Sequence, residues 1–100
     1  MNLEGLIIHF NYGSVYDPSY DLNHYTASQN VYVWSDSQAV KEKGFPCNVA
    51  GLLIVSSSYT NNSYIYVHQL YIARNNSQYW TRMYDHNVGQ WSEWAQFVLQ

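Results

Sequence analysis

Aromatic rings beside short amide and carboxylate side chains are the groups in this sequence best suited to recognise a ligand. They occur in two turn-like segments, Tyr59-Thr60-Asn61-Asn62 and Tyr84-Asp85-His86-Asn87. A flat ring offers an apolar surface to the face of a sugar, while amides and carboxylates hydrogen-bond to its hydroxyls. Asn and Asp are also favoured in turns for backbone reasons alone, so a purely structural interpretation stays open. The residues predicted to contact a glycan are Tyr59, Asn61, Asn62, Tyr84, Asp85, His86 and Asn87.

A second group of large side chains lies towards the C-terminus. Trp80, Arg82 and Tyr84 alternate along one predicted strand and therefore share a face, and Trp91 and Trp94 follow. The two tryptophans are spaced to stack on sugars, but packing at the end of the core is the favoured interpretation. The guanidinium group of arginine stacks on aromatic rings and also forms bidentate hydrogen bonds with carboxylates. We therefore expect Arg82 to form a buried ion pair, rather than a ligand contact, with one of Asp21, Asp85 and Glu93.

Catalytic and metal-binding patterns are weak in this chain. Its seven carboxylates are scattered, whereas glycoside cleavage requires two carboxyl groups at a fixed separation. Cys47 follows a proline and precedes an apolar run, where a buried small residue is expected rather than a nucleophile. The four histidines are dispersed, and a metal site needs three or four converging ligands. We expect no enzyme activity, no metal and no cofactor, although a trimer axis would bring three copies of one histidine together.

The composition limits the classes of partner. Charged residues make up 11% of the 100 residues, and the formal net charge is −3 with four Lys and Arg in total. Nucleic-acid binding requires clustered cations that displace counterions from phosphates, so we expect none. No apolar run approaches the ~20 residues that span a bilayer, and the first residues lack the positive charge of a secretory signal. We therefore expect no membrane insertion.

The elements that must position these residues are predicted to be strands. Short β-rich runs separated by turn signals favour an antiparallel meander or sandwich, with strands near 6–10, 30–34, 51–55, 63–72, 78–84 and 90–99. The run Gly51–Val55 is apolar at every position, which indicates a strand covered on both faces. Tyr64, Tyr66 and His68 should form a stripe that faces another subunit or a second packed layer.

One short helix is expected near residues 35–43. Ser35 and Asp36 are possible N-caps, Gly44 is the expected C-cap, and Pro46 prevents continuation. The predicted fold class is therefore all-β with one short helix. Because the strand pattern becomes regular only after residue 20, we expect residues 1–20 to be a strand or linker from a preceding stalk and residues 21–100 to be the folded domain.

The order of several short motifs resembles a known family. The motifs are Asp21-Leu22-Asn23, Asn30-Val31-Tyr32, Gly44-Phe45-Pro46, Gly51-Leu52-Leu53-Ile54-Val55, Gln69-Leu70-Tyr71, Trp80-Thr81-Arg82 and Trp91-Ser92-Glu93-Trp94. Over roughly residues 21–97 this order is similar to the pyocin-knob-like domain at the ends of phage and pyocin tail fibres. The ending, from Gln69 to Trp94, is the most specific part of the resemblance.

The resemblance implies a small β-rich knob at the tip of a fibre, carried as a homotrimer on a virion or phage-like particle and acting outside the cell. It implies recognition of bacterial surface polysaccharide or another receptor, without catalysis. The matching positions look structural, and it supplies no binding residues. The implied framework residues are Gly51, Gln69, Trp80, Arg82, Trp91 and Trp94.

Two other interpretations stay open. The chain is alternatively a structural trimerisation module whose many rings pack subunits together, or a carbohydrate-binding appendage of a cell-wall hydrolase. Solution mass separates a trimeric tip from a monomeric appendage. A glycan array separates binding from a purely structural role.

Overall fold

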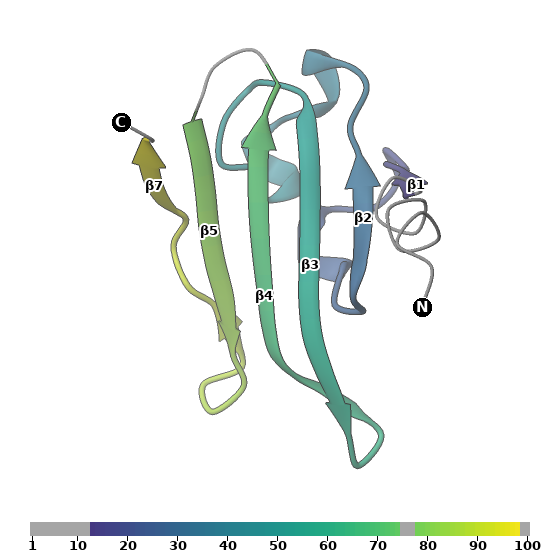
Figure 1. Cartoon of the computed structure of the whole chain (residues 1–100), viewed down its shortest axis with the longest axis vertical. Coiled ribbons are helices and arrows are strands. Elements are labelled where there is room, and N and C mark those ends of the chain that lie inside the picture. The colour runs from purple at the N-terminus through teal and green to yellow at the C-terminus, as the bar shows by residue number, and fades with distance from the viewer. Residues whose placement is uncertain (1–12, 75–77, 99–100) are drawn as a thin grey trace, which may run out of the picture.

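The computed structural model describes residues 13–74 and 78–98 of the chain. The strands are β1 (Ser14–Val15), β2 (Gln29–Tyr32), β3 (Gly51–Thr60), β4 (Ser63–Ala73), β5 (Gln78–Asp85), β6 (Gln90–Trp91) and β7 (Ala95–Val98). They form one seven-stranded sheet in the order β1-β2-β3-β4-β5-β6, with β7 also paired to β5 (Figure 1). The pairs from β2 to β6 are antiparallel, and β1 pairs with β2 in parallel. The predicted all-β fold is confirmed: β2 to β6 form an antiparallel meander, and the parallel β1 makes the sheet mixed.

The strand predictions differ from the structure mainly at strand ends. The strand predicted over 51–55 continues to Thr60 because its serine-rich second half pairs with the start of β4. The closing strand predicted over 90–99 is divided into β6 and β7, which both pair with β5. The strand predicted over 6–10 and the turn predicted at 75–77 lie outside the described residues.

The helix predicted near residues 35–43 is instead two 3-10 turns, η2 (Asp36–Gln38) and η3 (Lys41–Lys43). Both expected ends are present, because the Ser35 side chain accepts a hydrogen bond from the Ser37 amide and Gly44 is left-handed at φ 84°. Helices this short have little stability of their own, so tertiary contacts decide the backbone. Here the Asp36 carboxylate accepts from the Ala50 amide at 2.8 Å, and Ala39 is buried between the two turns.

One face of the sheet is covered by the segments that link β1 to β2 and β2 to β3. These segments contain η1 (Leu22–His24), η2 and η3, and they lie behind the sheet in Figure 1. The core between the two layers includes Leu22, Ala39, Phe45 and Ala50 from the cover and Val31, Leu53, Val55, Val67 and Tyr71 from the sheet. A sheet and a layer of turns thus bury one common apolar face.

Tyr16 and β1 precede the predicted domain boundary at residue 21. Tyr16 is buried in the common core, with its ring 5.3 Å from that of Phe45, and β1 lies in the sheet beside β2. Residues 1–12 lie outside the described part of the chain, so the boundary and the linker role of residues 1–20 stay predictions.

The other face of the sheet is open in the single chain. Leu52 is paired with Tyr32 on one side and Ile72 on the other, and Ile54 is paired with Leu70. These side chains are half-buried, whereas Leu53 and Val55 on the inner face are buried. The fully apolar run in β3 is therefore covered on one face by this chain itself.

Gly51 allows β3 and β4 to approach closely. A Cβ at this position would lie 2.0 Å from the carbonyl oxygen of Ile72, a backbone atom that cannot rotate away. We predict that Gly51→Ala lowers the free energy of unfolding by about 2–3 kcal/mol, the upper part of the range for overpacked sites. Urea unfolding measures the change, with the exposed Ser56→Ala on the same strand as the control. Equal stability of Gly51→Ala and Ser56→Ala would contradict the close strand contact.

Candidate functional site

Gln69 on β4 joins the sheet to its cover. Its side chain is fully buried, and its amide nitrogen donates to the carbonyls of Leu22 at 2.7 Å and Tyr25 at 2.9 Å. Its amide oxygen accepts from Nε of Arg82 at 2.8 Å, its register partner on β5. Both amide hydrogens and the carbonyl are thereby used. This one side chain fixes the backbone around η1 against two strands.

Arg82 is buried between two indole rings. It is 7% exposed, and its Cζ lies 4.1 Å from the ring centre of Trp91 and 4.5 Å from that of Trp94. Within residues 13–74 and 78–98 it makes no direct ion pair, so the predicted buried pair with Asp21, Asp85 or Glu93 does not form, although the more distant Asp21 carboxylate favours the charged form. The ring faces attract the cation where a carboxylate was expected. Burial lowers the pKa of Arg82 to about 10, so the group keeps its charge at neutral pH.

The C-terminal segment is fastened to the cover through Trp94. Its Nε1 donates to the carbonyl of Gly44 at 2.8 Å, just after η3. The ring of Trp91 meets that of Tyr84 at 5.5 Å, and Trp80 packs half-buried against the core. The structure therefore brings five of the predicted framework residues to the covered side of the sheet: Gln69, Trp80, Arg82, Trp91 and Trp94. The sixth, Gly51, allows the close approach of β3 and β4 described above. Two of the four tryptophans use their faces in packing around Arg82.

The two segments predicted to bind a glycan reach the same end of the sheet. The Asn61-Asn62 turn follows β3. Asp85 ends β5, which runs in the same direction as β3, and His86 and Asn87 follow it (Figure 1). We call this the distal end, defined by residues 56–67 and 84–90. Tyr59, Asn61, Asn62, Asp85, His86 and Asn87 are exposed there, and Tyr84 is half-buried. The structure thus gathers all seven predicted residues at one end of the molecule.

Backbone requirements explain part of the residue choice at the distal end. Asn61 and Asn62 have φ of 53° and 63°, as a two-residue type I′ hairpin requires. The Asp85 carboxylate accepts from the amide of Asn87 at 3.0 Å, which closes a local turn. Both interpretations of these turns therefore have support, because the same residues shape the backbone and leave exposed polar groups.

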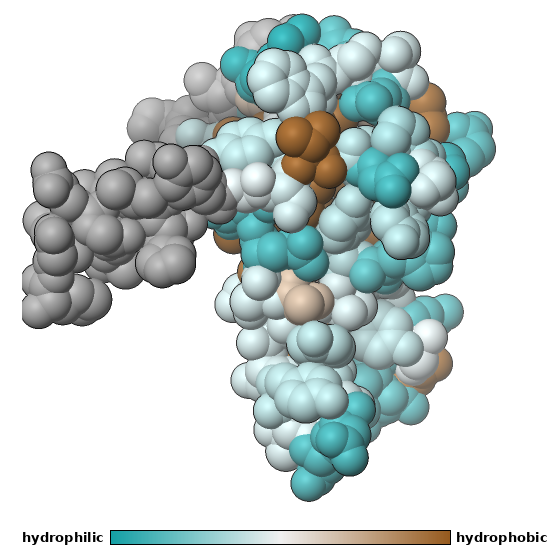
Figure 2. Space-filling model, turned by 90° about the vertical axis from the view of Figure 1, so that its right-hand side faces the viewer, coloured by the Kyte–Doolittle hydropathy of each residue, from teal (hydrophilic) through white to brown (hydrophobic). Residues whose placement is uncertain are grey.

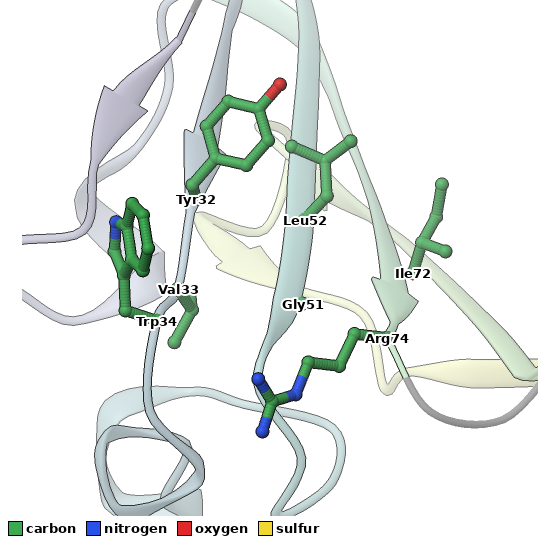
Figure 3. A pocket seen from close by; sticks show the side chains of 7 residues that line it. All are labelled: Tyr32, Val33, Trp34, Gly51, Leu52, Ile72 and Arg74. Atoms are coloured by element: carbon green, nitrogen blue, oxygen red, sulfur yellow. The ribbon is translucent and has the colours of Figure 1, made fainter.

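A shallow hollow of about 360 Å³ lies on the open face of the sheet (Figure 3). Leu52 and Ile72 provide apolar surface, Tyr32 and Trp34 stand on the β2 side, and Arg74 lies at the edge. Trp34 is 70% exposed, an unusual state for so large a ring. The sequence did not single out this hollow because it depends on the register of three neighbouring strands. The one sequence feature that pointed to this hollow was the apolar run over residues 51–55.

The other candidate chemistries remain separate in space. Among the described residues, no three His, Cys, Asp or Glu side chains gather into a possible metal site. The thiol of Cys47 is half-buried and lies 4.0 Å from the carbonyl of Val49. No helix in the described part of the chain has the length and apolar character needed to cross a membrane.

The fold is shared with a solved tail-fibre protein. The selenomethionine structure of an N-truncated R2-type pyocin tail fibre superposes with a TM-score of 0.72 at 20% sequence identity. The match covers 89% of this chain and 34% of the pyocin chain, so this chain spans about a third of that fibre fragment. No family model and no curated protein matches the sequence. The tail-fibre-like fold implied by the motif order is confirmed by this likeness.

The Gln69 hydrogen bonds should have a measurable effect on stability. Gln69→Leu keeps most of the side-chain volume but leaves two carbonyls and Nε of Arg82 without partners in a buried region. We predict a loss of at least about 2 kcal/mol in the free energy of unfolding, because each buried unsatisfied group costs about 1–3 kcal/mol. Urea denaturation followed by circular dichroism measures it. The exposed Gln96→Leu is the matched control, and equal stability of both variants would show that Gln69 does not hold the cover to the sheet.

Proposed function

We propose that this chain is a non-enzymatic receptor-binding element at the tip of a phage or phage-like tail fibre, and that it recognises bacterial surface polysaccharide. The observation that carries the proposal is a tail-fibre fold whose exposed rings and amides gather at one end. Recognition residues commonly sit on loops displayed by a rigid scaffold. As part of a virion or bacteriocin-like particle, the chain acts outside the cell that made it.

Binding without cleavage is the favoured chemistry for the distal end. Glycoside hydrolysis requires two carboxyl groups on either side of the scissile bond. In the segments 56–67 and 84–90, Asp85 is the one carboxylate, and it is exposed and engaged in its own turn. An exposed carboxylate without a second acid offers hydrogen bonds to sugar hydroxyls but no general acid–base pair. We expect incubation with a bound polysaccharide to release no reducing ends.

The open sheet face supports assembly as a homotrimer. Leu52, Ile54, Leu70 and Ile72 are apolar and only half-buried there, and the hollow bounded by Trp34 adds further apolar surface. Removing such surface from water is favourable, and obligate subunit interfaces resemble a core divided in two. Three weak sites on one particle then gain avidity through a high effective concentration. A purely structural trimerisation module would use the same face but would not need exposed rings at the distal end.

Loss of Asp85 should weaken glycan binding without unfolding the protein. We predict that Asp85→Ala lowers affinity for host polysaccharide about tenfold, the effect of roughly 1.4 kcal/mol in lost hydrogen bonding. Its melting temperature should stay close to that of the wild type because the side chain is exposed. Surface plasmon resonance with immobilised polysaccharide measures the affinity.

Asp17→Ala is the matched control for this experiment. Asp17 is also exposed and also accepts a hydrogen bond within a local turn, from the Ser19 amide at 2.9 Å, but it lies between β1 and β2. Normal binding by Asp85→Ala, or equal losses in both variants, would contradict a site at the β5–β6 turn.

A charge on the open face should prevent assembly. Leu52→Lys places an ammonium group among Tyr32, Ile72 and Trp34, where burial without a partner is unfavourable. We predict that light scattering gives three chains for the wild type and one for Leu52→Lys at micromolar concentration. Glu42→Lys, exposed on the cover, should leave the mass unchanged. A monomeric wild type would overturn the proposed assembly.

A further inference from the structure

The hairpin formed by residues 56–67 extends beyond its neighbouring strands. The pairing of β3 with β2 reaches Val55, and the pairing of β4 with β5 begins at His68. Residues 56–67 therefore form a two-stranded ribbon without a third strand beside it. It is the lowest part of the sheet in Figure 1 and the narrow lower extension in Figure 2, where its tip is hydrophilic.

An isolated two-stranded ribbon is marginally stable, so its stabilising contacts are informative. The rings of Tyr59 and Tyr64 form a cross-strand pair with centres 4.8 Å apart. At the base, the amide of Ser57 donates to the hydroxyl of Ser28 at 2.9 Å. The ring pair gives Tyr59 and Tyr64 a structural role in stabilising the hairpin.

Tyr66 is not explained by the stability of the hairpin. Ser56 pairs with His68 and Ser58 with Ile65, so Tyr66 and Val67 together face Ser57 in a β-bulge. Tyr66 takes the left-handed position of this bulge with φ 54°, where glycine is usual and a bulky side chain is strained. Its ring is 65% exposed, and within the described part of the chain it has no ring contact or side-chain hydrogen bond. Both the backbone and the exposed ring are unfavourable for the free protein.

Backbone strain of this kind concentrates at functional sites, and the surrounding groups indicate what Tyr66 would contact. Residues 56–67 include three tyrosines, whose exposures are 59%, 41% and 65% in sequence order, and no charged residue. The other polar groups are hydroxyls and the amides of Asn61 and Asn62. An ionic partner would find no opposite charge here. A neutral sugar would find ring faces for its apolar side and partners for its hydroxyls.

We propose that Tyr66, together with Tyr59 and Tyr64, forms a stacking platform for uncharged sugar residues. The inference rests on the proposed function. It adds the chemical class of the sugar and a residue that the sequence pattern assigned to a subunit interface or a second packed layer. Along β4 the exposed positions Tyr64, Tyr66 and His68 alternate with the inward positions Ile65 and Val67, so Tyr66 follows Tyr64 on the exposed side of the strand. The left-handed backbone at Tyr66 therefore carries an exposed ring beside those of Tyr59 and Tyr64 in the same hairpin.

A comparison of Tyr66→Gly and Tyr66→Phe tests the platform in the full chain. Tyr66→Gly removes the ring and the strain together, so its melting temperature should equal or exceed that of the wild type. Its affinity for neutral glycans on an array of neutral and acidic bacterial polysaccharides should fall about tenfold or more, as loss of roughly 1.4 kcal/mol of contact gives. Tyr66→Phe keeps the stacking face and should retain most of the affinity. Tyr20→Ala removes a tyrosine that is 51% exposed outside the hairpin and should bind normally.

The outcomes separate this inference from the proposed function. If the wild type binds glycans and Tyr66→Gly binds them equally well, the platform is overturned while the proposed function stands. A preference of the wild type for acidic glycans overturns the uncharged class. A change in the mass of the Tyr66→Gly particle with unchanged glycan binding assigns the ring to a second copy of the chain. Absence of binding by the wild type to every glycan overturns the platform and the proposed function together.

Discussion

The buried guanidinium of Arg82 is the constraint on which the rest of the structure depends. A cation without a carboxylate partner is costly to bury, so the groups around it must stay in place. Gln69 binds its Nε, and Trp91 and Trp94 stand on its two sides. Gln69 also binds the cover near η1, and Trp94 binds the carbonyl of Gly44 near η3. One charge thus organises two strands, both cover segments and the C-terminal segment.

This arrangement leaves the ends of the sheet free for other roles. Trp91 and Trp94 pack around Arg82, while the tyrosine rings of the hairpin formed by residues 56–67 are exposed. The hairpin tolerates a left-handed Tyr66 because pairing with β5 and the core contacts begin only with the next residues, Val67 and His68. A rigid body that carries a strained, exposed projection fits the proposed role in recognition.

The sequence predicted the local elements better than their pairing. Turn signals and β-rich runs were sufficient to predict β2 to β5, whereas a common framework between Gln69 and Trp94 was implied by the family resemblance. The bulge at Tyr66 was not predictable because it depends on the register between β3 and β4. The helix near 35–43 became two turns because Asp36 binds the distant Ala50 amide. Arg82 contacts aromatic rings instead of the expected carboxylate. This contact was not predictable because Trp91 and Trp94 come close to Arg82 only in the folded chain.

The central claim is that the Arg82 cation and its flanking rings act as one unit that holds the sheet to its cover. A double-mutant cycle on the free energy of unfolding, with Arg82→Met, Trp94→Leu and the double variant, tests this most directly. We predict a coupling energy of at least about 1 kcal/mol, because either substitution removes the contact that the other would lose. Effects that add to within about 0.5 kcal/mol would show that the two side chains stabilise the fold independently and would contradict the account.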